Sequence, residues 1–218
     1  MRTLAALTIL LTLPASSQRY DAARPDATIR EGSRVWISGA SNLRRFTCKA
    51  RQVSGALELR GTPTTGPLLT GTNVTPVPSI ELAVDGIDCG IGGMNRHLRE
   101  ALHSQQHPRI EFRLRAYEVD VKPAPGLARV DGHIVIAGVE RPLMLTATLR
   151  ADTLGTMHVA GRYDLHPSDF GIVPPRRFAG LLRVRDRVTV HFDIVLGSDG
   201  GTLDDICRSL ALAGHPQP

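Results

Sequence analysis

Three closely spaced histidines, His97, His103 and His107, are the residues of this sequence that most readily suggest chemistry. Positions 97 and 103 are six apart, about 600° around a helix, so their side chains would point to different sides. His103 and His107 have helical spacing, but Pro108 disfavours a helical conformation at His107. Because no cysteine or carboxylate stands at a matching ligand spacing, we expect no metal site and no cofactor. We interpret these histidines as solvated or helix-capping residues.

Motifs for catalysis are equally weak. Asp169-Phe170-Gly171 matches a kinase magnesium motif by its letters, but no glycine-rich phosphate loop or HRD-type catalytic loop accompanies it. Neither Ser38-Gly39 nor Ser54-Gly55 has the flanking residues of a Gly-x-Ser-x-Gly elbow. The sequence therefore predicts no catalytic residues, although a triad assembled from distant positions would leave no such motif.

The elements that would position any site are mostly strands. Apolar and polar side chains alternate in residues 53–59, 80–84, 110–117, 130–136, 143–149 and 188–196, with weaker candidates at 35–39 and 157–163. Such alternation is typical of strands with one buried and one wet face, and it favours an antiparallel sheet over a buried parallel one. Closing the sheet removes exposed edges, so we expect an all-β antiparallel barrel of about eight strands.

One helix is expected, over residues 94–103. Met94, Leu98, Ala101 and Leu102 form an apolar stripe, and Pro108 forbids continuation beyond the following turn.

Length and composition fit one domain with a core. The chain has 218 residues, of which 42% are hydrophobic and 22% charged. Aromatic residues make up only 4%, which offers few stacking platforms for bases, and we expect no nucleic-acid partner.

The formal charge is +5, and the densest basic cluster, residues 176–187, predicts a solvated basic face. Weak attraction of this face to anionic lipid headgroups or to nucleic acid is the alternative.

The N-terminus has the pattern of an export signal. Arg2 precedes an apolar run over residues 4–13 that is too short to span a bilayer, and small residues follow Pro14. We predict a signal peptide over 1–17 and a periplasmic or secreted protein; a buried N-terminal helix is the alternative. The remaining chain divides into a flexible lead-in (18–32), a barrel domain (33–197) and a C-terminal tail (198–218).

Export permits a disulfide among Cys48, Cys89 and Cys207. Cys48 follows the first predicted strand and Cys89 the third, so we expect these two to pair, although the spacing leaves other pairings open. Closing that loop would stabilise the fold by roughly 4 kcal/mol on a chain-entropy argument. Cys207 would then be left unpaired.

Several blocks of the sequence carry a family resemblance when taken in order. They are Trp36-Ile37-Ser38-Gly39 with Phe46, Val84-Asp85 with Ile87, Met94 to Leu98 with Leu102, His107-Pro108 before Ile110-Glu111-Phe112, Gly132 through Pro142, Ser168-Asp169-Phe170-Gly171-Ile172, and Arg187 to Leu196. Over about residues 33–197 the chain resembles the YceI-like family of exported lipid-binding, or polyisoprenoid-binding, proteins. It departs from the family in two places, with Asn95-Arg96 where members often carry Arg-Asp, and with His166-Pro167 before the Ser-Asp-Phe-Gly motif.

The resemblance implies a lipocalin-like barrel that holds a long-chain amphiphile, such as an isoprenoid, a quinone or a fatty-acyl derivative, in its interior. Strand alternation supplies the residues expected to face the lumen: Leu57, Leu59, Ile80, Leu82, Phe112, Leu114, Ile134, Ile136, Leu145, Ala147, Val190 and Phe192. We expect the small residues Gly55, Gly132 and Ala147 to leave room for a ligand. We expect Tyr117, in phase with Arg113 and Arg115, to face outward.

Two alternatives to a binding protein stay open. Every lumen-facing apolar residue is equally what a filled barrel core needs, which would leave an interaction protein with a basic face. An enzyme acting on a bound lipid would find its acid–base groups in His133, His158 or His191. Alternation places His133 and His191 on the wet face, which weakens this alternative.

Overall fold

The computed structural model describes residues 26–63, 68–73, 78–122, 125–152, 155–173, 176–177 and 182–213. The predicted signal peptide, the first part of the lead-in and part of the basic cluster lie outside the described residues.

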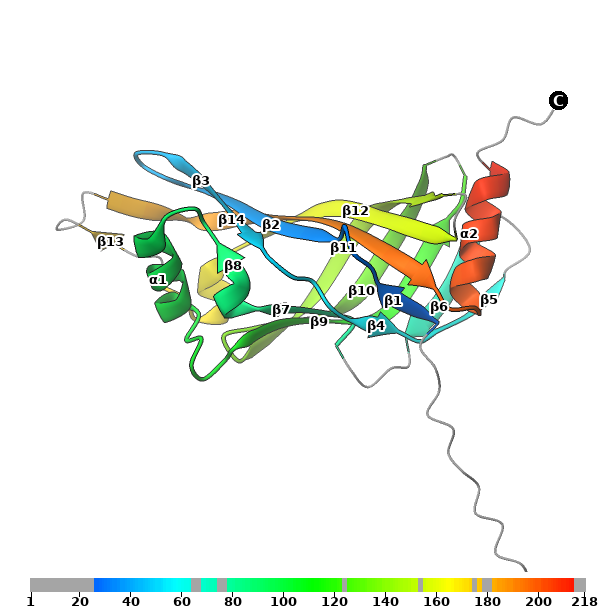
Figure 1. The fold of residues 1–218 in the computed structure, drawn as a ribbon, viewed down its shortest axis with the longest axis horizontal. Helices are drawn as coiled ribbons and strands as arrows, with labels where there is room; N and C mark the ends of the chain where they lie inside the picture. Colours follow the sequence, from blue (N-terminus) through cyan, green and yellow to red (C-terminus); the bar gives the residue numbers. More distant parts are fainter. Residues whose placement is uncertain are drawn as a thin grey trace, which may run out of the picture.

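The described chain forms a curled antiparallel sheet with a helix at each end (Figure 1). The longer strands are β2 (Arg34–Ser41), β3 (Arg45–Ala50), β5 (Leu59–Pro63), β6 (Leu68–Asn73), β9 (Arg109–Asp120), β10 (Gly126–Ile136), β11 (Val139–Ala151), β12 (Thr156–Leu165) and β14 (Leu182–Ser198). The shorter ones are β1 (Ala27–Ile29), β4 (Ala56–Leu57), β7 (Ile80–Ala83), β8 (Ile87–Asp88) and β13 (Arg176–Arg177). Two 3₁₀ turns, η1 (Val84–Gly86) and η2 (Pro167–Phe170), complete the elements between them.

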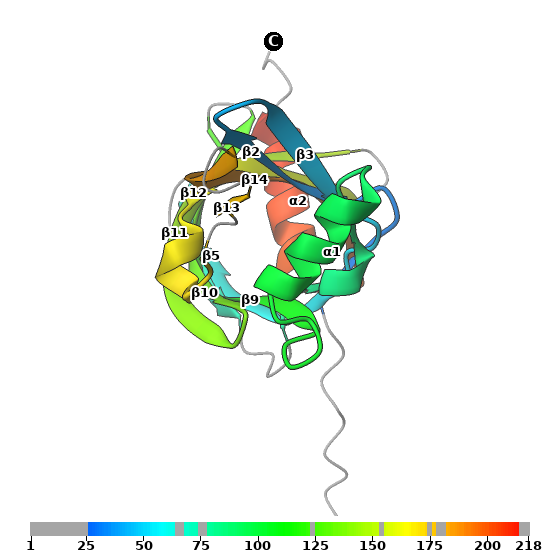
Figure 2. The ribbon, with the colours of Figure 1, turned by 90° about the vertical axis from the view of Figure 1, so that its left-hand side faces the viewer.

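Strand pairing follows the order β5-β6-β9-β10-β11-β12-β14-β2-β3-β8. β7 pairs with β9, β13 pairs with β14, and β1 pairs with both β14 and β4. Backbone hydrogen bonds between Ser54 and Glu81 link the segment before β4 to β7. Seen along the long axis, the strands curve around that axis (Figure 2).

The expected count of about eight strands was too low, because fourteen strands lie in the described residues. The additional ones include segments of two or three residues, too short to show alternation. One of them, β1, lies in the stretch expected to be a flexible lead-in, and there Ala27 is fully buried between β14 and β4.

A bulge in β9 changes which side chains face inward. Gly132 pairs with Leu114 but Asp131 pairs with Ala116, so Arg115 is the extra residue on β9. The alternation beyond the bulge is therefore reversed, and Tyr117 is buried on the inner side. The expectation that Tyr117 faces outward was wrong for this reason.

Helix α1 (Gly92–Ala101) begins and ends two residues earlier than predicted. His103 has φ 51° and ends the helix in the left-handed conformation, and its backbone N–H donates to the Glu100 carbonyl. The His107 ring packs over Gly138, which forms the β10–β11 turn together with Ala137. Both histidines thus have structural contacts, and no group of three metal-ligating side chains occurs among the described residues.

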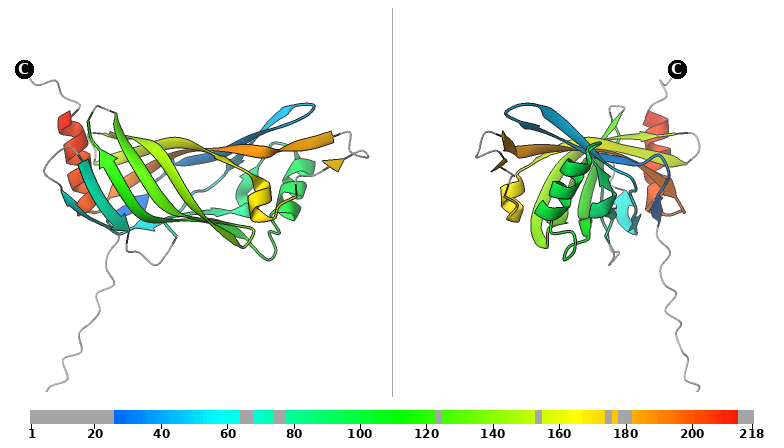
Figure 3. Two further views of the ribbon diagram at one scale, coloured as in Figure 1. Left: turned by 180° about the vertical axis from the view of Figure 1, so that it is seen from behind. Right: turned by 60° about the vertical axis from the view of Figure 1, so that its left-hand side comes forward.

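A second helix, α2 (Thr202–Ala213), lies where a C-terminal tail was expected. It buries Leu203, Ile206, Cys207 and Leu210, and it packs against β5 and β11 at the end of the sheet opposite α1 (Figure 3). The tail prediction was wrong over this helix. Neither helix has the length and hydropathy of a membrane span, as judged over the described residues.

The expected disulfide between Cys48 and Cys89 is present, and it ties β3 to the loop that leads into α1. Cys207 is free and buried in α2.

Candidate ligand-binding cavity

The curled sheet surrounds a cavity of about 670 Å³. Along β9 its lining extends from Ile110 to Val119, roughly 30 Å at about 3.3 Å per residue. Ile206 of α2 borders it at one end, and Met94 and Leu98 of α1 border it at the other. The cavity is therefore long and runs between the two helices.

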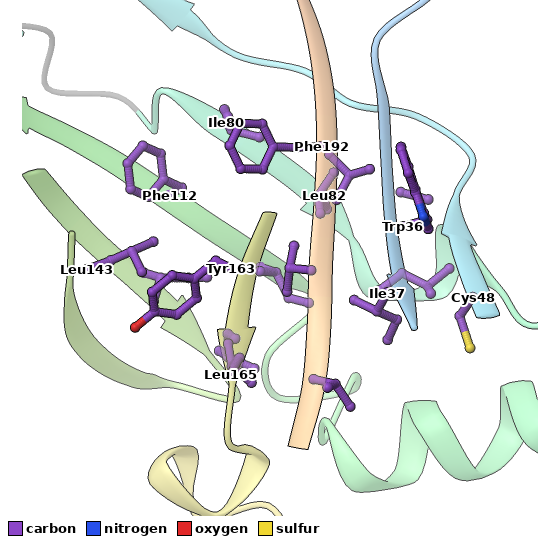
Figure 4. A pocket seen from close by; sticks show the side chains of 18 of the residues that line it. Trp36, Ile37, Cys48, Ile80, Leu82, Phe112, Leu143, Tyr163, Leu165 and Phe192 are labelled. Atoms are coloured by element: carbon purple, nitrogen blue, oxygen red, sulfur yellow. The ribbon is translucent and has the colours of Figure 1, made fainter. Parts of the chain in front are cut away.

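The lining is overwhelmingly aliphatic and aromatic. Side chains from several strands of the sheet line the space, among them Phe112, Leu143, Tyr163 and Phe192 (Figure 4). A volume of this size lies in the range of about 300–1,000 Å³ that is typical of small-molecule sites. An interior of this kind can solvate an apolar chain but offers few polar partners.

Eleven of the twelve residues predicted to face the lumen line this cavity. They are Leu57, Leu59, Ile80, Leu82, Phe112, Leu114, Ile134, Ile136, Leu145, Val190 and Phe192. The twelfth, Ala147, is buried in β11 but is not among the lining residues. That these side chains bind a ligand stays a prediction.

The small residues do not leave room in the way that was expected. A Cβ atom on Gly132 would lie 2.8 Å from the Phe112 ring, and one on Gly55 would collide with the Ser79 carbonyl. Protein atoms thus already occupy the space beside both glycines. Gly132 instead lets the Phe112 ring lie close against the sheet, so its effect on the lumen is indirect.

The same arrangement recurs around the cavity. Gly39 lies under Phe46, Gly161 under Phe192 and Gly71 under Tyr117, each pair formed directly across two neighbouring strands. All four aromatic side chains, including Phe112, line the cavity. Because a ring held flat on a glycine projects less from the wall, these pairs keep the lumen wide.

Tyr117 is the polar group at the α2 end of the cavity. Its hydroxyl oxygen is the one buried side-chain nitrogen or oxygen atom of the described residues that has no hydrogen-bond partner. Burial, together with the negative charge of Asp26, raises the pKa of Tyr117 to about 12. By contrast the Ser79 hydroxyl, also buried in the lining, accepts hydrogen bonds from the Leu114 N–H and the Asn73 amide.

The opposite end of the cavity is held by the disulfide and by a carboxylate. Asp88 Oδ1 accepts hydrogen bonds from the Gly90 N–H (2.9 Å) and Asn95 Nδ2 (2.8 Å). Asn95 Oδ1 in turn accepts from the Cys89 N–H at 2.7 Å. The hydrogen bond from Asn95, followed by that from Gly90, lowers the pKa of Asp88. These links fix the start of α1 beside the opening.

The histidines considered for catalysis lie outside the cavity. His133, His158 and His191 are absent from its lining. His191 stacks on Trp36, with ring centroids 5.1 Å apart, and its Nε2 lies 2.9 Å from Ser38 Oγ. The described residues therefore bring none of these acid–base groups to the apolar interior.

Sequence reasoning missed several lining residues. Tyr117 and Val119 face the lumen because of the bulge at Arg115, which no residue pattern marks. Ile206 could have been found, since Leu203, Ile206 and Leu210 have helical spacing. Arg44 and Arg185 line the opening from a turn and an irregular strand segment, where alternation gives no guidance.

A curled antiparallel sheet around a long apolar cavity places this chain in the lipocalin-like class of β-proteins. Within that class it belongs to the YceI-like family, since the YceI-like domain matches residues 30–196. No curated protein sequence is significantly similar to the chain.

Two solved structures share the fold. A polyisoprenoid binding domain from Saccharophagus degradans, implicated in plant cell wall breakdown, superposes with a TM-score of 0.56 at 12% identity, covering 80% of this chain and 99% of that one. BcnA of Burkholderia cenocepacia superposes with a TM-score of 0.53 at 15% identity, covering 75% of this chain and 95% of that one. At these identities the similarity shows the fold alone.

Proposed function

We propose that this chain is an exported, non-catalytic binding protein that holds one long-chain amphiphile inside its curled sheet. The ligand classes that fit are isoprenoids, quinones with a long tail and fatty-acyl derivatives. The observation that carries the proposal is the apolar cavity of about 670 Å³ that extends between α1 and α2. The structurally similar domain from Saccharophagus degradans is named for polyisoprenoid binding, which agrees with this ligand class.

The shape of the cavity favours a chain over a compact molecule. Burying ten methylene groups contributes roughly 8 kcal/mol before the entropic costs of binding. Micromolar affinity then needs no special polar contact, which suits a lining with so few polar groups.

Periplasmic or secreted localisation rests on two features. The Cys48–Cys89 disulfide fits an oxidising compartment, and the first seventeen residues have the pattern of a signal peptide. The absence of catalysis is proposed because His133, His158 and His191 lie away from the lining, and His97, which does line the cavity, is paired with Glu100 on α1.

Two neighbouring residues of β11 provide a matched test of binding inside the sheet. Leu145 lines the cavity, whereas the side chain of Met144 points outward and Met144 is 78% exposed. We expect the delipidated chain to take up about one molecule of the apolar fluorophore N-phenyl-1-naphthylamine. Leu145→Trp should weaken this uptake at least about tenfold by filling the lumen, and Met144→Trp should leave it unchanged.

Circular dichroism and the smaller change Leu145→Phe separate loss of binding from loss of folding. Uptake equal in the two tryptophan variants, or absent from the folded wild-type chain, would refute binding inside the sheet.

A further inference from the structure

The end of the cavity beside α1 gathers exposed apolar side chains. Leu43 is 74% exposed in the β2–β3 turn, Val173 is 79% exposed after η2, and Ile91 is exposed just before α1. Isolated exposed apolar residues are common on protein surfaces. These three, however, come from three separate segments, the β2–β3 turn, the residues after η2 and the start of α1, which lie around the same end of the sheet (Figure 3).

Two arginines accompany them. Arg44 and Arg185 both line the cavity at this end, as does Ile91. We call Leu43, Arg44, Ile91, Val173 and Arg185 the mouth rim. An apolar interior thus opens directly onto a border that is apolar and positively charged.

Hydrogen bonds within the β2–β3 turn fix its backbone, and this backbone directs Leu43 outward. Ser41 Oγ accepts hydrogen bonds from the Leu43 N–H at 3.2 Å and from the Arg44 N–H at 3.1 Å. The Ser41 hydroxyl also donates to the Arg44 carbonyl. Exposing Leu43 in this way costs hydration free energy that another surface could recover.

The two arginines of the rim form no ion pair within the described chain. Neither Arg44 nor Arg185 takes part in a salt bridge there. Asp186, next to Arg185, instead accepts hydrogen bonds from the N–H and hydroxyl of Ser168.

Several arginines on the outer face of the sheet are paired with carboxylates, unlike those of the rim. Arg129 pairs with Glu118 at 3.1 Å, and Arg187 pairs with Asp164. The rim therefore presents positive charge beside exposed apolar groups, which is the combination that binds anionic lipid surfaces.

We propose that the mouth rim docks on a membrane surface that contains anionic lipids, so that a long chain passes between the bilayer and the cavity without crossing water. This inference rests on the proposed function, because only a carrier of such a chain needs that passage. Leu43, Ile91 and Val173 enter the interface, and Arg44 and Arg185 contact lipid phosphates. Docking at this end also aligns the open cavity with the acyl layer.

Flotation of the delipidated chain with lipid vesicles tests the apolar part of the rim. We expect binding to vesicles of phosphatidylcholine mixed with phosphatidylglycerol, weak binding to phosphatidylcholine alone, and a decrease with added salt. Leu43→Asp combined with Val173→Asp should reduce binding at least about tenfold. The matched control, Leu127→Asp with Met144→Asp, changes two exposed apolar residues away from the rim and should bind like the wild type.

A second pair of variants tests the charged part. Arg44→Gln with Arg185→Gln should reduce binding to the anionic vesicles by about 25-fold, at about fivefold for each arginine. Arg150→Gln with Arg162→Gln makes the same change of net charge on exposed residues of β11 and β12 outside the cavity lining and should have a much smaller effect.

Equal binding by rim and control variants, preference for neutral vesicles, or no binding to vesicles would overturn the docking. Uptake of N-phenyl-1-naphthylamine without vesicles separates the two proposals. If uptake persists while vesicle binding fails, the carrier function stands and the docking does not; if the folded chain takes up no fluorophore, the carrier function itself fails.

Discussion

The two ends of the cavity are closed in different ways. At one end α2 buries Leu203, Ile206, Cys207 and Leu210, and Ile206 completes the lining. At the other end α1 has no buried residue within its bounds, and the Cys48–Cys89 disulfide and Asp88 hold its start in place. Helix α2 closes one end because its apolar face is buried against the sheet. Helix α1 is fixed mainly by the disulfide and the hydrogen bonds at its start, so it can lie beside an opening.

For the proposed carrier function, this difference predicts that a ligand would enter and leave beside α1. Moving α2 would expose four buried side chains at once, whereas moving α1 would expose only the partly buried Met94, Leu98 and Ala101. The two ends should therefore respond to different perturbations, which should change the free energy of unfolding by different amounts.

Truncation in α2 should have the largest effect on stability. Leu203 is fully buried, so Leu203→Ala should lower the free energy of unfolding by about 3–4 kcal/mol through lost transfer energy and a cavity. Leu212, 72% exposed on the same helix, gives the control, and Leu212→Ala should cost less than about 0.5 kcal/mol. Urea unfolding measures both values. Similar costs for the two substitutions would mean that α2 does not plug the cavity.

Removal of the disulfide should loosen the opposite end. The bond closes a loop with a sequence separation of 41, and its loss in Cys48→Ala/Cys89→Ala should lower the free energy of unfolding by about 2–4 kcal/mol. Hydrogen exchange should increase in α1 more than in α2. Exchange that increases equally in both helices would contradict the separate roles of the two ends.

A methyl group under an aromatic ring should narrow the lumen between the ends. A Cβ on Gly161 would lie 2.6 Å from the Phe192 ring, so Gly161→Ala should push the ring inward and cost about 1–3 kcal/mol in stability. Uptake of N-phenyl-1-naphthylamine should weaken. A Cβ on Gly86 meets only ordinary contact, at 3.8 Å, and Gly86→Ala should preserve uptake. Undiminished uptake in Gly161→Ala would show that the ring pairs do not set the lumen width.

Mildly alkaline pH should have the smallest effect, and it should act on the α2 end, where Cys207 and Tyr117 lie. Burial raises the pKa of the Cys207 thiol from 9.0 to about 11, and that of Tyr117 from 10.0 to about 12. The unfolded chain then binds fewer protons, so the free energy of unfolding should fall as pH rises from about 9, first through Cys207 and then through Tyr117, until about pH 12, and it should stay constant just below that window. Urea midpoints across this range measure the loss. A loss unchanged in Cys207→Ala would exclude the thiol as a cause.

Strand faces were predictable from the sequence where the pairing is regular. Eleven lumen-facing predictions coincide with the lining because Leu57, Ile80, Ile134 and their partners follow simple alternation. Tyr117 shows the limit of that rule, since one extra residue on β9 reverses the inner and outer faces, and only the pairing with β10 reveals it.

The ends of the cavity were less predictable than its wall. The apolar spacing of α2 is present in the sequence, but Gly200 and Gly201 before it and the short length made the segment look like a tail. Which glycines lie under aromatic rings depends on cross-strand contacts that no local pattern encodes. The Cys48–Cys89 pairing was predicted and is confirmed, although the sequence alone left other pairings open.

Competition of n-alkanols of increasing length against N-phenyl-1-naphthylamine tests the hollow, elongated lumen most directly. If the cavity extends from α1 to α2, each added methylene should raise the affinity of the delipidated chain about fourfold until the space is filled, after which the gain should stop. Leu145→Trp should bring that limit to shorter chains. A sheet whose side chains met across its axis would give no competition and no dependence on length, and this result would contradict the account.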